Sequence, residues 1–407
     1  MKILFLTDNF PPEVNAPASR TYEHCKEWVS QGVDVTVITC VPNFPFGKTY
    51  TGYKNKLYQE EVIDDIKVVR VWTYMVPNTG FFLRTLDFIS FSIMSFFVGL
   101  FKSADIVMAT SPQFFTALSG RALSVMKRKP YVLEIRDLWP EQLLSFGKVK
   151  KNLLIKYFEW EEIRCYRKAR LIVSVTESYV NKISERGIDS KKIIIIKNGV
   201  DKNKFKPIRK DQDLLSKYNL NDKFIVGFIG THGMSQNLSF IIDCIASFNS
   251  NAKYHNDIHF LFIGEGADKK TIMRKAVKNQ IFNITFVDQV SKEEMPNHIS
   301  LLDISLVPLR RSNLYLSVIP SKIFELAAMN IPILLGVNGE ARNLIEKYNC
   351  GLFYEPENKN SFLSGLTKMV YNKNMLAEFR KGGELLSLDY SRKSLANMLL
   401  ERIKLLT

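Results

Sequence analysis

The 407-residue chain is poor in cysteine, with five that are scattered along its length. They are Cys25, Cys40, Cys165, Cys244 and Cys350, and no two form a Cys-x-x-Cys pair. An odd number at irregular spacing argues against a disulfide framework and against a zinc site. We therefore expect a reduced, cytoplasmic setting.

Signatures of hydrolytic and metal-dependent chemistry are also missing. None of the five histidines lies beside a nucleophile motif. The Asp-x-Asp pair Asp211 and Asp213 falls in a charged linker, where solvated charge explains it. The chain has no short-period repeat and no low-complexity region. We expect neither a bound metal ion nor a cofactor.

No apolar run reaches the roughly 20 residues that a membrane-spanning helix needs. In the aromatic-rich segment Gly80–Phe101, the uninterrupted stretch Phe88–Phe101 has 14 residues, three of them serine. Arg84 and Asp87 interrupt any longer window. A buried helix of an α/β domain and an amphipathic helix on a membrane surface both remain open. The N-terminus enters a strand at once, so we expect no signal peptide.

Length and charge suggest two domains and an anionic partner. A chain of 407 residues exceeds one ordinary core. The 56 Lys and Arg against 41 Asp and Glu give a net charge of +15, which suits phosphorylated ligands, nucleic acid or an anionic membrane. The basic residues are spread over both halves without a recognition motif, which argues against nucleic acid.

Runs dense in Ile, Val and Leu without strict alternation predict parallel strands buried on both faces. In the first half these are Lys2–Thr7, Val33–Thr39, Lys67–Trp72, Asp105–Ala109, Tyr131–Arg136, Leu171–Val175 and Ile193–Ile196. In the second half they are Phe224–Ile229, His259–Ile263, Ile284–Val287, Ile304–Val307 and Ile331–Leu335. We predict an α/β protein of two Rossmann-like domains facing a cleft, residues 1–200 and 201–385. The closing helix within 386–407 is expected to return to the first domain.

Groups suited to a nucleotide follow four strands of the second half. Ser321 is a candidate helix N-cap, Lys322 adds positive charge, and Glu325 offers an acceptor for sugar hydroxyls. The glycines between other strands and helices allow a diphosphate to approach the backbone. The remaining candidate donor-binding residues are Gly230, Thr231, His232, Gly233, Gly264, Gly266 and Gln289.

Ionisable groups also follow strands of the first half. The loop after the first strand contains Asn15 and ends at Ser19, a candidate cap, and Arg20, which could reach an anion. Glu134, Arg136 and Asp137 interrupt another strand end, which suggests a site.

The chain resembles the retaining GT-B glycosyltransferases of family 4 over essentially its whole length. The resemblance rests on the motifs DNFPPEVNAPASRTYEH, EIRDLWPE, VSVTESY, KNGVD, GFIGTHGMSQNL, FIGEG and VIPSKIFELAAMNIPIL. Within that family it is similar to the WbuB-like transferases of bacterial O-antigen and capsule assembly, which are proposed to transfer N-acetyl-L-fucosamine.

This resemblance implies a UDP-sugar donor on the second domain and a lipid-diphosphate-linked saccharide acceptor on the first. It implies Lys322, Arg136 and Asp137 as catalytic, Glu325 as the ribose ligand, and Asn15, Ser19, Arg20 and Glu134 as acceptor-binding. It further implies work as a peripheral protein on the inner face of the cell membrane.

Two departures from the family pattern bear on mechanism. The loop Gly230–Gln236 lacks the Arg and Lys that usually hold the diphosphate, and Ser317 replaces the first of two paired glutamates. A sugar-nucleotide epimerase of the same double-Rossmann shape, or a GDP-mannose donor, stays as an alternative.

Overall fold

The computed structural model describes residues 1–407 except 14, 45, 78–81, 112–113, 140–151 and 251–256. The chain divides into two compact units. Unit 1 consists of Met1–Asn198 and Arg392–Thr407, and unit 2 of Gly199–Ser391. The change from unit 1 to unit 2 thus falls two residues before the boundary predicted between residues 200 and 201. The helix that belongs to unit 1 again begins at Arg392, six residues later than the predicted segment.

Unit 1 is built on an eight-stranded sheet in the order β3-β4-β2-β1-β5-β6-β7-β8. Its strands are β1 (Lys2–Leu6), β2 (Asp34–Cys40), β3 (Tyr58–Ile63), β4 (Ile66–Val71), β5 (Ile106–Ser111), β6 (Tyr131–Ile135), β7 (Leu171–Ser174) and β8 (Ile193–Ile195). All neighbours pair in parallel except β3, which runs antiparallel to β4. Because β5 and β6 are buried along their full length, their uninterrupted apolar character is what the fold requires.

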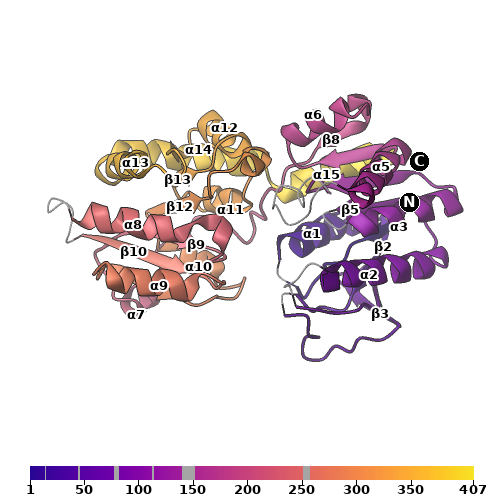
Figure 1. Ribbon diagram of the computed structural model, residues 1–407, viewed down its shortest axis with the longest axis horizontal. Coiled ribbons are helices and arrows are strands. Elements are labelled where there is room, and N and C mark those ends of the chain that lie inside the picture. Colours follow the sequence, from indigo (N-terminus) through magenta and orange to yellow (C-terminus); the bar gives the residue numbers. More distant parts are fainter. Residues whose placement is uncertain (14, 45, 78–81, 112–113, 140–151, 251–256) are drawn as a thin grey trace. The chain divides into compact units, whose positions relative to one another are not determined.

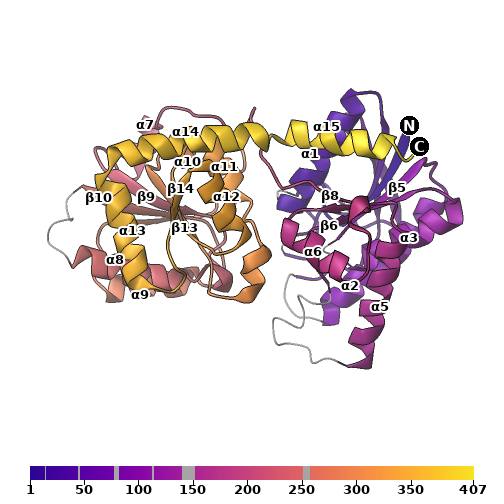
Figure 2. The ribbon, with the colours of Figure 1, turned by 90° about the horizontal axis from the view of Figure 1, so that it is seen from above.

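The helices of unit 1 cover both faces of this sheet. They are α1 (Ala16–Ser30), α2 (Phe82–Leu100), α3 (Phe114–Lys127), α5 (Leu153–Lys168), α6 (Glu177–Glu185), the 3₁₀ helix η1 (Ser190–Lys192) and α15 (Arg392–Lys404). Helix α15 packs beside α1 on one side, while α2, α3 and α5 lie on the other (Figure 2). The indole N–H of Trp28 in α1 donates to the carbonyl of Ala396, 2.9 Å away. The last helix is therefore an integral layer of unit 1.

Unit 2 is built on a six-stranded, all-parallel sheet in the order β11-β10-β9-β12-β13-β14 (Figure 1). Its strands are β9 (Phe224–Ile229), β10 (Ile258–Ile263), β11 (Ile284–Val287), β12 (Ile304–Pro308), β13 (Ile333–Gly336) and β14 (Gly351–Phe353). Its helices are α7 (Gln212–Lys217), η2 (Met234–Gln236), α8 (Leu238–Asn249), α9 (Lys269–Lys278), α10 (Met295–Ser300), η4 (Asn313–Ser317), α11 (Lys322–Ala328), α12 (Glu340–Tyr348), α13 (Lys359–Tyr371) and α14 (Lys373–Asp389). The prediction of two Rossmann-like α/β domains with parallel sheets is confirmed.

The strand order of unit 2 identifies its binding edge. The chain moves outward in one direction from β9 and in the other from β12, so these adjacent strands form the topological switch point. In open α/β sheets, ligands bind at the carboxyl ends of the strands that flank such a point. The loops after β9 and β12 are therefore where a site should be sought.

Helix α2 is the apolar segment for which the sequence allowed either a buried helix or a helix on a membrane surface. Its segment Leu83–Leu100 is long and apolar enough to cross a membrane by length and composition, with a mean hydropathy of 1.5. One side of it packs against α3 and the sheet through Phe91, Ser95 and Gly99. The opposite side leaves Leu86, Ile93 and Phe97 about half exposed. The helix is thus covered on one face and open on the other.

Candidate functional site

Three glycines let the loops of unit 2 pack closely at the carboxyl edge of the sheet. Gly264, after β10, has a φ of 144°, and a Cβ there would lie 2.0 Å from the carbonyl oxygen of Gly230. A Cβ on Gly266 would lie 2.4 Å from the carbonyl oxygen of His232. The loops after β9 and β10 are also joined by a hydrogen bond from the N–H of His232 to the carbonyl of Glu265, at 2.8 Å. The predicted glycine positions therefore form one continuous backbone surface.

Lys322 projects its ammonium group into this surface. Its Nζ lies 4.2 Å from the ring centroid of buried Phe228, and a Cβ on Gly230 would lie 2.6 Å from that Nζ. Among the described residues no hydrogen-bond acceptor contacts this nitrogen. Burial lowers the pKa of Lys322 to about 8, and the neighbouring charge of Glu325 opposes that shift. The structure thus holds a desolvated cation against a glycine at the switch point, with the charge of Glu325 nearby but no acceptor in contact with its nitrogen.

His232 contributes its backbone and a neutral ring. The imidazole is fully buried against Phe228, with ring centroids 5.6 Å apart. Burial lowers its pKa to about 4, with the charges of Lys269 and Lys322 acting in the same direction. The ring is therefore uncharged at neutral pH and adds no charge to the site.

The start of α11 agrees with the prediction in position but lacks the predicted capping contact. Ser321 has helical backbone angles (φ −59°, ψ −30°), and its hydroxyl makes no capping hydrogen bond. Ser321 holds the N-cap position, as predicted, but its side chain does not cap the helix. The carbonyls of Pro320 and Ser321 accept instead from the N–H groups of Ile323 and Phe324, each at 3.1 Å. Glu325, one turn on, is half-buried. Ser317, in the position of the family's first glutamate, is buried in η4 with its hydroxyl directed to the carbonyl of Leu314.

The remaining donor-site candidates line the exposed rim of the same edge. Thr231, Gly266 and Gln289 are exposed, and Gly233 is half-buried. Near them, the buried ammonium of Lys269 pairs with Glu265 at 2.5 Å and with Asp288. This pairing fixes the loops after β10 and β11 relative to each other.

Two cations at this edge were not identified from the sequence. Arg310 and Arg311 follow β12 after Leu309, and the N–H of Arg310 donates to the carbonyl of Ser235 at 2.8 Å. Both side chains are exposed. The sequence places both arginines in the loop after a predicted strand, but only the sheet order shows that this strand lies beside β9 at the switch point.

In unit 1, Arg20 and Glu134 form a buried ion pair. The Nε of Arg20 donates to Glu134 at 2.8 Å, and its other nitrogens donate to the carbonyls of Ile196 and Lys197. Thr110 donates to the second carboxylate oxygen at 2.9 Å. Burial alone would raise the pKa of Glu134, but the charges of Arg20 and Arg136 hold it at about 2. The expectation that Arg20 and Glu134 reach a ligand does not agree with these contacts. Their polar atoms already bind one another, Thr110 of β5 and the backbone after β8, and so link α1 to β5, β6 and that segment.

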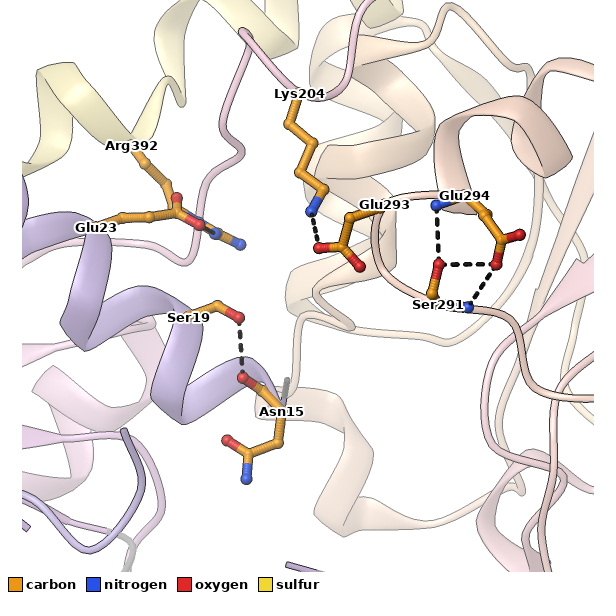
Figure 3. A network of polar contacts seen from close by, with 8 residues as sticks. All are labelled: Asn15, Ser19, Glu23, Lys204, Ser291, Glu293, Glu294 and Arg392. Carbon is orange, nitrogen blue, oxygen red and sulfur yellow. Dashed lines mark hydrogen bonds and ion pairs between the residues drawn. The ribbon is translucent and has the colours of Figure 1, made fainter. Parts of the chain in front are cut away.

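Asn15 and Ser19 have local roles at the start of α1 (Figure 3). Asn15, and not Ser19, is the N-cap: its side-chain oxygen accepts from the N–H of Ala18 at 2.9 Å. The Ser19 hydroxyl donates back to the Asn15 carbonyl at 3.1 Å, and Ser19 is buried inside the helix. The prediction of Ser19 as a cap was displaced by four residues, because Pro17 at the helix start is compatible with the first turn.

Arg136 and Asp137 remain the open candidates of unit 1. They follow β6, and both are half-buried. The Nη1 atom of Arg136 is buried without a hydrogen-bond partner among the described residues. Burial lowers the pKa of Arg136 to about 10, with Glu134 opposing the shift. Pro140 and Glu141 of the same motif lie outside the described residues.

Two carboxylates near this edge were also missed. Burial raises the pKa of Asp8, just after β1, to about 6, and that of Asp87 in α2 to about 7. The charge of Asp8 raises the pKa of Asp87 further, while Arg84 lowers both. Asp8 could have been found from its place after the first strand. Within the parts of the chain that the structure describes, no three His, Cys, Asp or Glu residues are grouped to hold a metal ion.

Comparison with known proteins gives consistent matches for both units. Residues 18–204 match the family described as Glycosyltransferase Family 4, and residues 211–385 match Glycosyl transferases group 1. The putative colanic acid biosynthesis glycosyl transferase WcaI of Escherichia coli (strain K12) is 24% identical over 91% of this chain and 92% of that protein.

Two solved structures show the same fold. Sucrose-phosphate synthase from Thermosynechococcus elongatus superposes with a TM-score of 0.75 at 13% identity, covering 100% of this chain and 99% of that one. Anabaena HepE, solved in complex with UDP-glucose, gives a TM-score of 0.71 at 14% identity over 99% of each chain.

Proposed function

The chain belongs to the glycosyltransferases of the GT-B fold, and we propose that it transfers a sugar from a UDP-sugar to a lipid-diphosphate-linked saccharide. The reaction retains the anomeric configuration and requires no metal ion. The product contributes to a bacterial surface polysaccharide such as an O-antigen or capsule, and N-acetyl-L-fucosamine is the first sugar to test. Support comes from the role in colanic acid synthesis that the name of WcaI carries, and from the UDP-glucose complex of HepE.

The observation that carries the donor assignment is the position of Lys322. An ammonium group that is removed from water without a hydrogen-bond acceptor costs free energy, and a bound anion offsets that cost. Its nitrogen lies beside a glycine after β9, where a diphosphate can approach the backbone. As the sugar leaves, negative charge develops on the diphosphate oxygen, and a fixed cation stabilises that charge. Lys322 is the catalytic residue in this proposal.

The rest of the donor is assigned around Lys322. Glu325, one turn along α11, accepts hydrogen bonds from the ribose hydroxyls. Gly264, Gly266 and Gln289 border the base. Arg310, in the loop after β12, supplies further positive charge. It replaces in part the Arg and Lys that the loop after β9 lacks.

The acceptor is assigned to the carboxyl edge of unit 1. Arg136 has a buried Nη1 that lacks a described partner, which suits a phosphate or a sugar oxygen. Asp137, the next residue, is assigned to orient an acceptor hydroxyl. Arg20 and Glu134 act through position, since their pairing fixes the strand end from which Arg136 projects.

We also propose a place of action on the inner face of the cell membrane. A lipid-linked acceptor requires the enzyme to reach the bilayer surface, and α2 has an apolar face that its own unit leaves open. Because the other face packs on α3 and the sheet, α2 lies in the interface and does not span it.

The test is a transfer assay with purified protein, a lipid-diphosphate saccharide and a panel of UDP- and GDP-sugars in the presence of EDTA. We expect transfer from a UDP-sugar, with Lys322→Met inactive and Lys278→Met, an exposed lysine of α9, fully active. Release of an epimerised nucleotide sugar without acceptor would instead identify an epimerase.

A further inference from the structure

Helix α5 of unit 1 has an exposed face of unusual composition. Four exposed side chains, those of Leu153, Tyr157, Trp160 and Arg164, recur at helical spacing and share one stripe. Leu153 is 83% exposed, and Tyr157 and Trp160 are each 52% exposed. One turn beyond, the guanidinium of Arg164 lies 4.4 Å from the ring centroid of Trp160. Two aromatic rings with polar edges thus stand on the surface beside a cation.

Every fully exposed charged residue of α5 is positive. Lys156, Arg164, Arg167 and Lys168 are exposed. The sequence also places three glutamates on this helix, at positions 159, 161 and 162, and none of them is exposed. The fold therefore separates charges that are mixed along the sequence.

Two of the glutamates, Glu161 and Glu162, are buried and bind partners on α5 and on neighbouring segments. The Glu161 carboxylate is shared by Arg121, at 2.6 Å, and Arg164, at 2.8 Å. Glu162 accepts from Tyr166 at 2.5 Å and pairs with Arg186. Two of the three negative charges are thus neutralised inside unit 1, while the cations Lys156, Arg167 and Lys168 face outward.

The exposed face of α5 belongs to the same layer as the open face of α2. Helix α3 packs against both helices on this side of the sheet. Helix α2 exposes Leu86, Ile93 and Phe97, and its two charged residues, Arg84 and Asp87, are half-buried. One layer therefore presents an uncharged apolar face and a basic, aromatic face. Trp and Tyr with Lys and Arg are the side chains that favour the headgroup region of a bilayer.

We propose that the α5 face, comprising Lys156, Tyr157, Trp160, Arg164 and Arg167, binds the headgroups of anionic phospholipids while the open face of α2 enters the acyl boundary. The occupant is an anionic bilayer, because the exposed charges are of one sign and the aromatic rings have polar edges. This inference rests on the proposed function, in which the acceptor lies in that bilayer. It adds that the enzyme selects membranes by their negative charge through α5.

The experiment measures binding to phosphatidylcholine vesicles with and without phosphatidylglycerol, without substrates. The double variant K156E/R167E should weaken binding to the anionic vesicles about tenfold or more and leave binding to neutral vesicles unchanged. Arg164 is kept, since it shares Glu161. The matched control is R274E/K278E on α9 of unit 2, which reverses two exposed cations and should have less effect. Ile93→Ser with Phe97→Ser should weaken binding to both kinds of vesicle.

The fluorescence of Trp160 provides a second measurement, made on the folded wild-type protein. Its fluorescence should shift to the blue on anionic vesicles and be quenched by brominated lipid, and Trp160→Phe should abolish that quenching. UDP binding, which depends on unit 2, should be the same in all α5 variants, so that failure of the membrane inference is distinct from failure of the donor site. Equal weakening by the α5 and α9 variants would overturn the proposal. Absence of Trp160 quenching on anionic vesicles would also overturn it. So would binding of the wild-type protein to RNA that is tighter than its binding to anionic vesicles and is lost in K156E/R167E.

Discussion

The ammonium of Lys322 is the residue on which the donor site depends. It lies on the face of Phe228, beside a glycine that leaves it room, and no described acceptor satisfies it. Its lowered pKa, about 8, means that the protein holds the charge at a cost. An anion that binds there relieves that cost, which links affinity to pH.

UDP affinity should therefore depend on pH between 7 and 9.5 in the direction set by Lys322. Above pH 7 the terminal phosphate of UDP, with a second pKa of about 6, is almost fully ionised, so the lysine dominates the change in charge. The uracil N3–H begins to ionise toward the top of this range, and uridine titrated alongside reports that contribution. Above its pKa of about 8, binding must first recover a proton, and the dissociation constant should rise about tenfold per pH unit. Calorimetric titrations across this range measure it. Lys322→Met should bind weakly with a flat profile, whereas a wild-type profile that is flat would exclude Lys322 from the diphosphate site.

Glu325 should act through the ribose. Glu325→Ala is expected to weaken UDP binding by about 1.5–3 kcal/mol, as for a lost hydrogen bond to a charged group. With 2′-deoxy-UDP the same substitution should cost less, because one hydroxyl partner is already gone. Equal losses with both nucleotides, in a variant that melts like wild type, would refute contact between Glu325 and the 2′-hydroxyl.

For single residues, the sequence predicted which side chains lie at the candidate donor site better than it predicted their hydrogen-bond partners. Lys322 and the glycines of the donor edge were found because residues between a strand and a helix have restricted uses. Ser19 was wrong as a cap, because Asn15 already caps the helix, and Ser321 has the N-cap position without the capping hydrogen bond. A serine before a helical run predicts the helix start but does not by itself predict that contact. Arg20 was assigned to an anion, whereas its partner Glu134 lies 114 positions along the chain. Such a pairing follows from sheet order and not from local sequence.

Among the elements, the pair Arg20–Glu134 holds α1 to the centre of the unit 1 sheet. Arg20→Met leaves the buried carboxylate unpaired and should lower the free energy of unfolding by about 3–5 kcal/mol. Urea unfolding followed by tryptophan fluorescence measures the loss. The control is Lys67→Met at the exposed pair Lys67–Asp34, which should cost less than about 1 kcal/mol.

The pH dependence of the same pair has a defined sign. Because the folded pKa of Glu134 is about 2, below its ordinary value of 4.5, its stabilisation is present above pH 4.5 and is lost as pH falls toward 2. Arg20→Met should lose that dependence. If Arg20→Met instead melts like wild type but loses acceptor affinity, the original assignment of Arg20 to a ligand is right.

The sequence predicted the buried parallel strands and missed two edge strands. Strand β3, Tyr58–Ile63, alternates between exposed and half-buried positions and carries two glutamates, so it has no apolar run to detect. Strand β14 has three residues. The inward turn of the α5 glutamates was equally hidden, because it depends on Arg121 and Arg186 from other elements.

For the whole molecule, two α/β units could be predicted because the chain exceeds one ordinary core and its predicted strands form two sets, the first ending at Ile196 and the second beginning at Phe224. Its net charge of +15 has no single explanation along the sequence. The structure assigns parts of it to separate places, with Lys322 and Arg310 at the edge of unit 2 and the outward cations of α5 on unit 1. A protein that handles a diphosphate donor and a lipid diphosphate at an anionic surface has a use for both.

The central claim is that unit 2 binds the diphosphate of a UDP-sugar through Lys322 without a metal ion. The most direct measurement is calorimetric binding of UDP and of uridine to the wild-type protein and to Lys322→Met, all in EDTA. We predict that wild-type protein binds UDP in EDTA, that Lys322→Met binds UDP at least about a hundredfold more weakly, the scale of a lost charge-assisted contact, and that uridine binding is unchanged. Binding of UDP that requires added magnesium or manganese, or that survives intact in Lys322→Met, would contradict the claim.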